Sequence, residues 1–156
     1  MAPTPTITRA VFAEEVRGFM RDHPALNRLI VGNESSNRMI DYCMTLAIDE
    51  WNTTPPQDAR AFETFPSRVI LLYLTIVHLL FSVSLLKTRN RLRYVDGGWS
   101  SDPESQAEDY LRMIQMIRSQ IAPQMMSLKV SNNIENAWGG GVSSEYAWIN
   151  TWYGYT

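Results

Sequence analysis

An uncharged stretch, residues 69–86, constrains this chain more than any other feature of its sequence. Basic residues flank it, with Arg68 directly before it and Lys87 directly after it. A run of this length reaches the lower limit for a helix that crosses a bilayer, and flanking cations are typical of a membrane anchor. The same run also suits the central helix of a helical bundle. The stretch is therefore either a membrane span or a buried helix.

Polar residues within the stretch favour the buried helix. Thr75, His78 and Ser82 are spaced by three and four, which places them on one side of a helix. A helix that faces lipid has no use for such a stripe unless another helix covers it. In a bundle, the apolar side fills the core and the stripe meets solvent or a neighbouring subunit. We therefore predict a soluble protein in which these three residues lie off the main core.

Two further segments, which precede the uncharged stretch, have the apolar periodicity of amphipathic helices. The first runs from Thr8 to about residue 22 and stops before Pro24, because proline disfavours helical geometry in the preceding residue. The second covers about 34–51, and Ser35 or Ser36 can cap it. The third predicted segment, 66–91, contains the uncharged stretch.

The fourth helix begins at Asp102-Pro103, where an aspartate suits the N-cap and a proline the first helical position. Pro123 is expected to end or kink this helix, because it lacks a backbone donor. Before the start of this helix, Asp96-Gly97-Gly98 predicts a tight chain reversal. The expected fold is mainly α, a bundle of about four helices over 8–130 with a flexible tail at 1–7.

Composition sets limits on the class of protein. At 156 residues the chain can form one domain with a single core. A formal charge of -2 gives no overall attraction to nucleic acid. Cys43 is the single cysteine, which excludes an internal disulfide and fits a reducing compartment. The start of the chain lacks the basic and apolar regions of a signal peptide.

The segment 131–156 differs in character from the rest of the chain. Six of the 17 aromatic residues fall in its last 19 positions. Three glycines at 139–141 indicate a hinge, and Tyr146, Trp148 and Trp152 are spaced by multiples of two, as on one face of a strand. Either the tail folds onto its own bundle or it is an arm that reaches a partner, and we favour the arm. Its expected interface residues are Tyr146, Trp148, Ile149, Trp152, Tyr153 and Tyr155.

The sequence contains no recognisable catalytic or metal-binding motif. His78 is interpreted as a hydrogen-bonded packing residue, because the sequence offers it no catalytic partner. Asp49 and Glu50 are interpreted as solvent-exposed charges, since neighbouring helical residues point about 100° apart. We therefore predict that the chain is not an enzyme and holds neither cofactor nor metal.

A basic run follows the uncharged stretch. It could lie along a phosphate backbone or at an interface, or it could be a solvated helix end whose cations favour the C-terminal dipole. The second interpretation is preferred. The cations are Lys87, Arg89, Arg91 and Arg93.

Three segments together make the chain resemble the head–tail adaptor family of tailed bacteriophages, also called neck or head-completion proteins. They are Ala47-Ile-Asp-Glu-Trp-Asn-Thr-Thr-Pro-Pro, the segment 87–98 with Asn90-Arg-Leu-Arg-Tyr-Val-Asp-Gly-Gly, and Asn133-Ile-Glu-Asn-Ala-Trp-Gly-Gly followed by Ser144-Glu-Tyr. Each is a structural pattern and none is a catalytic signature.

The resemblance implies a structural virion protein of the neck that is assembled in the host cytoplasm. It implies a homo-oligomeric ring of twelve subunits below the portal, bound to the portal protein and to an adjoining neck or tail protein. Double-stranded DNA would pass through its channel without sequence-specific contact, and no membrane would be involved. The chief alternative is a membrane protein of holin type that uses residues 69–86 as its span.

Overall fold

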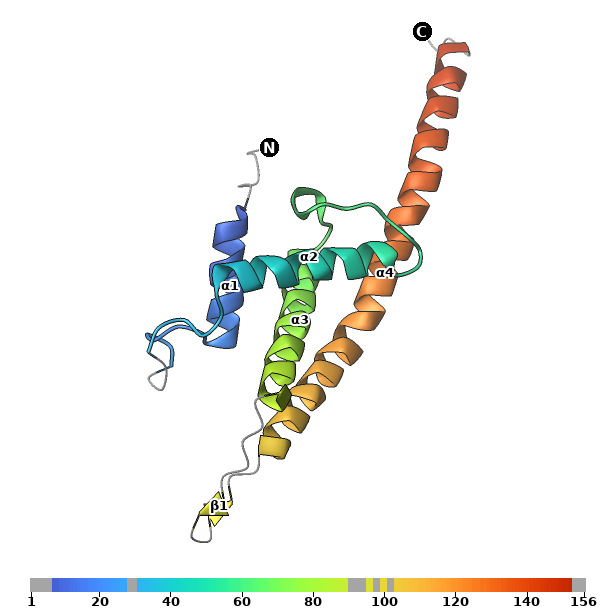
Figure 1. Ribbon diagram of the computed structural model, residues 1–156. Helices are drawn as coiled ribbons and strands as arrows, with labels where there is room; N and C mark the ends of the chain where they lie inside the picture. The colour runs from blue at the N-terminus through green and yellow to red at the C-terminus, as the bar shows by residue number, and fades with distance from the viewer. Residues whose placement is uncertain (1–6, 28–30, 90–94, 97–98, 101–102, 153–156) are drawn as a thin grey trace. The chain divides into compact units, whose positions relative to one another are not determined.

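The computed structural model describes the backbone of residues 7–27, 31–89, 95–96, 99–100 and 103–152. Within these ranges, it leaves out the side chains of Lys87, of the described residues between 95 and 107, and of 135–152. The chain is mainly helical, which confirms the predicted fold class (Figure 1). Its α-helices in this part of the chain are α1 Arg9–Met20, α2 Asn37–Thr53, α3 Arg68–Arg89 and α4 Pro103–Trp152.

Helix α1 is capped at both ends. The Thr8 hydroxyl accepts a hydrogen bond of 3.4 Å from the backbone N–H of Val11 and so caps the first turn. The helix ends at Met20 because Arg21 adopts a left-handed conformation with φ of 53°. The amide of Asp22 then bonds to the carbonyl of Arg17, which closes the last turn. The predicted helix is confirmed, and its end at Met20 lies two residues before the expected end at about residue 22.

Helix α2 begins after Ser36, whose hydroxyl accepts from the Met39 amide at 3.2 Å. Of the two predicted candidates, Ser35 and Ser36, it is thus Ser36 that caps α2. At the other end, the Asn52 side chain both accepts from and donates to the backbone of Arg60, at 2.9 Å each way. This pair holds the connecting loop against α2, and a short 3-10 turn, Phe62–Thr64, follows it. Aromatic contacts of Phe12 with Phe62 and of Trp51 with Phe65 anchor the same loop.

Helix α3 is the central helix of the core. It packs against α1 and most extensively against α2, which crosses it (Figure 1). Nearly every residue of its first three turns after Val69 is buried or half-buried, so it has no wide polar face there. Its fully buried side chains include Leu74, Ile76 and Val77. The uncharged stretch therefore forms a buried helix in this structure, because its apolar side chains pack against α1 and α2.

The predicted polar stripe of α3 is wrong at Thr75. This side chain is completely buried, and its hydroxyl donates a hydrogen bond of 2.7 Å to the carbonyl of Leu71, one turn earlier. A threonine that satisfies its hydroxyl on its own helix can enter a core at little cost. His78 and Ser82 are half-buried.

The predicted chain reversal after α3 is present. Strand β1, Val95–Asp96, pairs antiparallel with strand β2, Trp99–Ser100, in the register Asp96 to Trp99. The two residues between the strands are Gly97 and Gly98. A pairing of this register requires the chain to turn back between positions 96 and 99.

Helix α4 continues through Pro123, so of the two expected effects of this proline, a kink or an end, the end does not occur. An interior proline removes one backbone hydrogen bond and costs about 3 kcal/mol, which a long helix can absorb. The chain nevertheless divides close to this proline, into a compact unit 1–121 and a second unit 122–156. The first unit contains α1 to α3 and the first part of α4.

The backbone of 131–152 is helical, which differs from the expected extended arm. Trp148 and Trp152 are four residues apart, a spacing that suits one side of a helix as well as one face of a strand. The aromatic side chains of this segment, and all of residues 153–156, lie outside the described residues.

Candidate functional site

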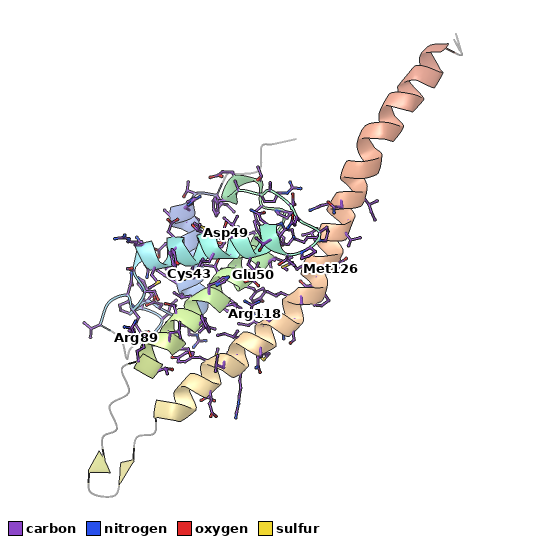
Figure 2. All side chains as sticks on the ribbon, turned by 45° about the vertical axis from the view of Figure 1, so that its right-hand side comes forward. Cys43, Asp49, Glu50, Arg89, Arg118 and Met126 are labelled. Carbon is purple, nitrogen blue, oxygen red and sulfur yellow. The ribbon has the colours of Figure 1, made fainter. Side chains whose placement is uncertain are left out.

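One carboxylate joins three helices of the first unit. Glu50 lies in the last turns of α2, and both of its oxygens accept hydrogen bonds from Arg118 of α4, at 2.5 and 3.1 Å. The Nε2 atom of His78, in the middle of α3, lies 2.8 Å from Oε2 of the same carboxylate. We call these residues the Glu50 bridge. Figure 2 labels Glu50 on α2 and Arg118 on α4.

The bridge lies at the edge of the core. The side chains of Glu50 and His78 are 22% and 20% exposed, and that of Arg118 is 47% exposed. A bidentate guanidinium–carboxylate pair is both directional and stronger than a neutral hydrogen bond. Because Arg118 remains half in water, screening reduces its contribution to stability.

The electrostatics of the bridge keep Glu50 ionised. Its contact with His78 is the largest influence and lowers the pKa of Glu50. Burial acts in the opposite direction, while the hydrogen bond and the positive charge of Arg118 lower the pKa further. The net effect is a pKa below the ordinary glutamate value. A carboxylate of this kind is a poor proton donor near neutral pH, so the arrangement suits attachment of helices better than acid catalysis.

One interpretation of this cluster was wrong. Glu50 was expected to be a solvent charge, but it is half-buried and paired. His78 was interpreted as a hydrogen-bonded packing residue, and its contact with Glu50 agrees with that interpretation. Sequence spacing could not find the cluster, because each member comes from a different helix. The one available signal was the position of His78 on the polar side of an otherwise apolar helix.

A second polar cluster joins α1 to the start of α2. Arg17 is buried, and its Nη1 donates to the carbonyl of Ser35 at 2.6 Å while its Nη2 donates to Oδ1 of Asn37 at 2.5 Å. The buried Asp22 accepts from the backbone amides of Glu34 and Ser35, at 2.5 and 2.8 Å. These bonds give both buried charges polar partners and fix the chain before α2, while Nε of Arg17 has no hydrogen-bond partner among the described residues and lies 3.5 Å from Oε1 of Glu14. Neither member had been singled out from the sequence.

The predicted basic run is described only in part. Arg89 is the last residue of α3 and is exposed (Figure 2). Lys87 belongs to α3, but its side chain lies outside the described residues, as do Arg91 and Arg93 altogether. The predicted arm residues Tyr146, Trp148, Ile149 and Trp152 lie on the helical backbone of α4, whereas Tyr153 and Tyr155 are outside the described residues. Arg89, the one cation of the run whose side chain the structure describes, is not part of the Glu50 bridge.

Apolar side chains are exposed where α2 and α3 meet. The hydroxyl of Ser82 lies 3.8 Å from the sulfur of Met39, so the start of α2 adjoins the second half of α3. Tyr42, one turn along α2, is 61% exposed, and Leu86, one turn beyond Ser82, is 59% exposed. We call the set the α2–α3 face. Sequence reasoning did not identify it, because the sides of the two helices that stay exposed depend on how the helices pack. Its apolar members are Met39, Tyr42, Leu85 and Leu86.

The segment Arg68–Leu86 is long and apolar enough to cross a membrane, judged by length and composition alone. Half of that stretch is buried inside the structure. The core helix of a soluble protein meets the same criterion, so this feature is weak evidence for a span.

Within the described residues, no group of three or more His, Cys, Asp or Glu side chains is arranged to hold a metal ion. Comparisons with protein-family models, with curated proteins and with solved structures gave no match.

Proposed function

We propose that this chain is a structural virion protein, a ring-forming head–tail adaptor that joins the portal to the neck or tail of a bacteriophage. The observation that carries the proposal is the α2–α3 face, where large apolar side chains are exposed on a well-packed helical unit. Exposed apolar surface of this kind marks contacts with other proteins. Repeated contacts between unlike surfaces of identical subunits close into a ring when their rotation permits it.

Other features agree with a mechanical role. The described charged clusters hold helices and loops in place, and the ionised Glu50 is a poor general acid. The resemblance of three sequence segments to the adaptor family supplies the remaining terms of the proposal, namely a ring of twelve subunits, the portal and an adjoining neck protein as partners, and DNA in the channel. The exposed Arg89 is a candidate contact for that channel or for a neighbouring subunit.

Electron microscopy and native mass spectrometry of the purified chain test the proposal. We expect closed rings, and we expect Leu86→Glu to disperse them, because a buried unpaired carboxylate is costly at an apolar interface. Gln115→Glu, at an exposed polar position of α4, is the control and should leave rings intact. A monomer at all accessible concentrations, with or without the portal protein, would refute the proposal.

A membrane protein of holin type is the second candidate, and the length and composition of α3 are the observation that favours it. The two candidates differ in where the expressed chain is found. Recovery in the membrane fraction that resists salt and alkali extraction would support the span, whereas recovery without detergent would support the adaptor. The packing of α1 and α2 against α3 would have to open before α3 could enter a bilayer.

A further inference from the structure

The Glu50 bridge is a polar contact that joins α4 to α2 and α3. Three isoleucines of α4, Ile114, Ile117 and Ile121, are buried at helical spacing. On the same stretch Leu111, Met113 and Met116 remain exposed. The apolar attachment of this stretch of α4 is therefore a single narrow stripe, and Arg118 lies within it.

We propose that Glu50, His78 and Arg118 form a latch that holds the first part of α4 against α2 and α3 and releases it when the Glu50 carboxylate is neutralised. A neutral carboxyl loses the charge that attracts the guanidinium and keeps only weak hydrogen bonds. The contact with His78 weakens at the same time, so one proton acts on two helices. Release exposes the isoleucine stripe of α4 and makes it available to another protein surface. This inference does not depend on the proposed adaptor function.

The surroundings single out Glu50 as the group that controls the latch. On α2 the adjacent carboxylate, Asp49, is exposed. The charged residues of α1 make their ion pairs elsewhere: Arg9 with Asp41, Arg17 with Glu14 and Asp22, and Glu15 with Arg68. In the loop after α2, Asp58 pairs with Arg60 at 2.7 Å. The imidazole of His78 and the guanidinium of Arg118 are thus the basic side chains that pair with Glu50 from α3 and α4.

Hydrogen exchange of the full chain tests the latch, with protection factors corrected for intrinsic rates. We expect amides in 108–121 of Glu50→Gln to lose protection roughly tenfold at pH 7, the size expected when a charge-assisted hydrogen bond is lost. Amides in 43–48, inside α2, serve as the internal reference and should change much less. Asp49→Asn is the matched control and should behave as the wild type.

Acidification of the sample provides a second test of the latch. In the wild type, protection of 108–121 should fall as the pH is lowered from about 5 to 3, because the pKa of Glu50 lies below its ordinary value, whereas in Glu50→Gln the same segment should already be weakly protected at pH 7. Arg118→Met tests the opposite side of the pair and serves if Glu50→Gln fails to fold. The latch is refuted if both variants keep wild-type protection in 108–121. It is equally refuted if all segments lose protection together, or if Asp49→Asn has the same effect.

Discussion

Nη1 of Arg17 donates a hydrogen bond of 2.6 Å to the carbonyl oxygen of Ser35, so that a buried side chain of α1 fixes the residue before the α2 cap. Asp22 holds the amide of the same residue from the other side. The start of α2 is therefore positioned by α1, although 16 residues separate the two helices. Buried charges of this kind are stable only while every partner is present.

Replacing Arg17 by methionine should lower the free energy of unfolding by about 3–5 kcal/mol, because it leaves Asp22 as a buried carboxylate without its cation. Urea titration followed by circular dichroism would measure the loss. Arg9→Met is the matched control: Arg9 pairs with Asp41 on the surface, and such pairs contribute about 0–1 kcal/mol. Equal effects of the two substitutions would show that the buried cluster is not a significant source of stability.

Leu79→Ala should cost about 2–5 kcal/mol, the range for large-to-small changes at fully buried positions. Leu79 is buried in α3, whereas Leu72 on the same helix is only half-buried. Leu72→Ala should therefore cost less than Leu79→Ala in the same urea titration. The reverse order would mean that α3 packs differently in solution, as it would if it entered a membrane.

The stability of the chain should fall on the acid side through Glu50. Its pKa is lower in the folded chain than the ordinary value of 4.5. Folding therefore gains stability from the ionised form above that value, and the gain is lost as the pH falls through the folded pKa. The free energy of unfolding of Glu50→Gln should vary less with pH between about 5 and 3 than that of the wild type. Parallel pH profiles for the two proteins would contradict this assignment.

Cys43 should react slowly with alkylating reagents while the chain is folded. Burial raises the pKa of its thiol to about 11, and the side chain is inaccessible. The thiolate is the reactive form, so at pH 8 very little of it is present. Iodoacetamide labelling followed by mass spectrometry should be at least about tenfold faster in urea than in buffer. Rapid labelling of the native chain would show that the core around α2 opens readily.

The helices were predictable because their causes are local. The cap at Ser36 and the apolar run of α3 can be recognised from neighbouring residues, and the two glycines after Asp96 predict the reversal. The helical course through Pro123 was not predictable, because the penalty of one proline competes with the many backbone hydrogen bonds of a long helix. The conformation of 131–152 was also missed, since Trp148 and Trp152 have a spacing that fits both strand and helix.

The charged clusters were not predictable for a different reason. Glu50, His78 and Arg118 meet only once α2, α3 and α4 are packed, and nothing in their spacing records that contact. Thr75 was misplaced because its polarity was taken to require solvent, whereas the carbonyl of Leu71 satisfies its hydroxyl within the helix. Residue spacing cannot predict interactions that depend on tertiary packing, even when the helices that carry them are predicted correctly.

Truncation after Trp138 should leave the first unit folded and weaken assembly. Unit 1–121 has its own core, so its melting temperature should change little. The removed segment forms part of α4, so helix content should fall by the contribution of residues 139–152 alone.

Trp148→Ala and Trp152→Ala, four positions apart on α4, should reproduce part of the loss of assembly, because Trp is enriched at binding hot spots. This outcome rests on the proposed adaptor function and would be read from ring formation and portal binding. If circular dichroism showed the truncated chain to be unfolded, the segment would belong to the core and its role as a contact arm would be abandoned.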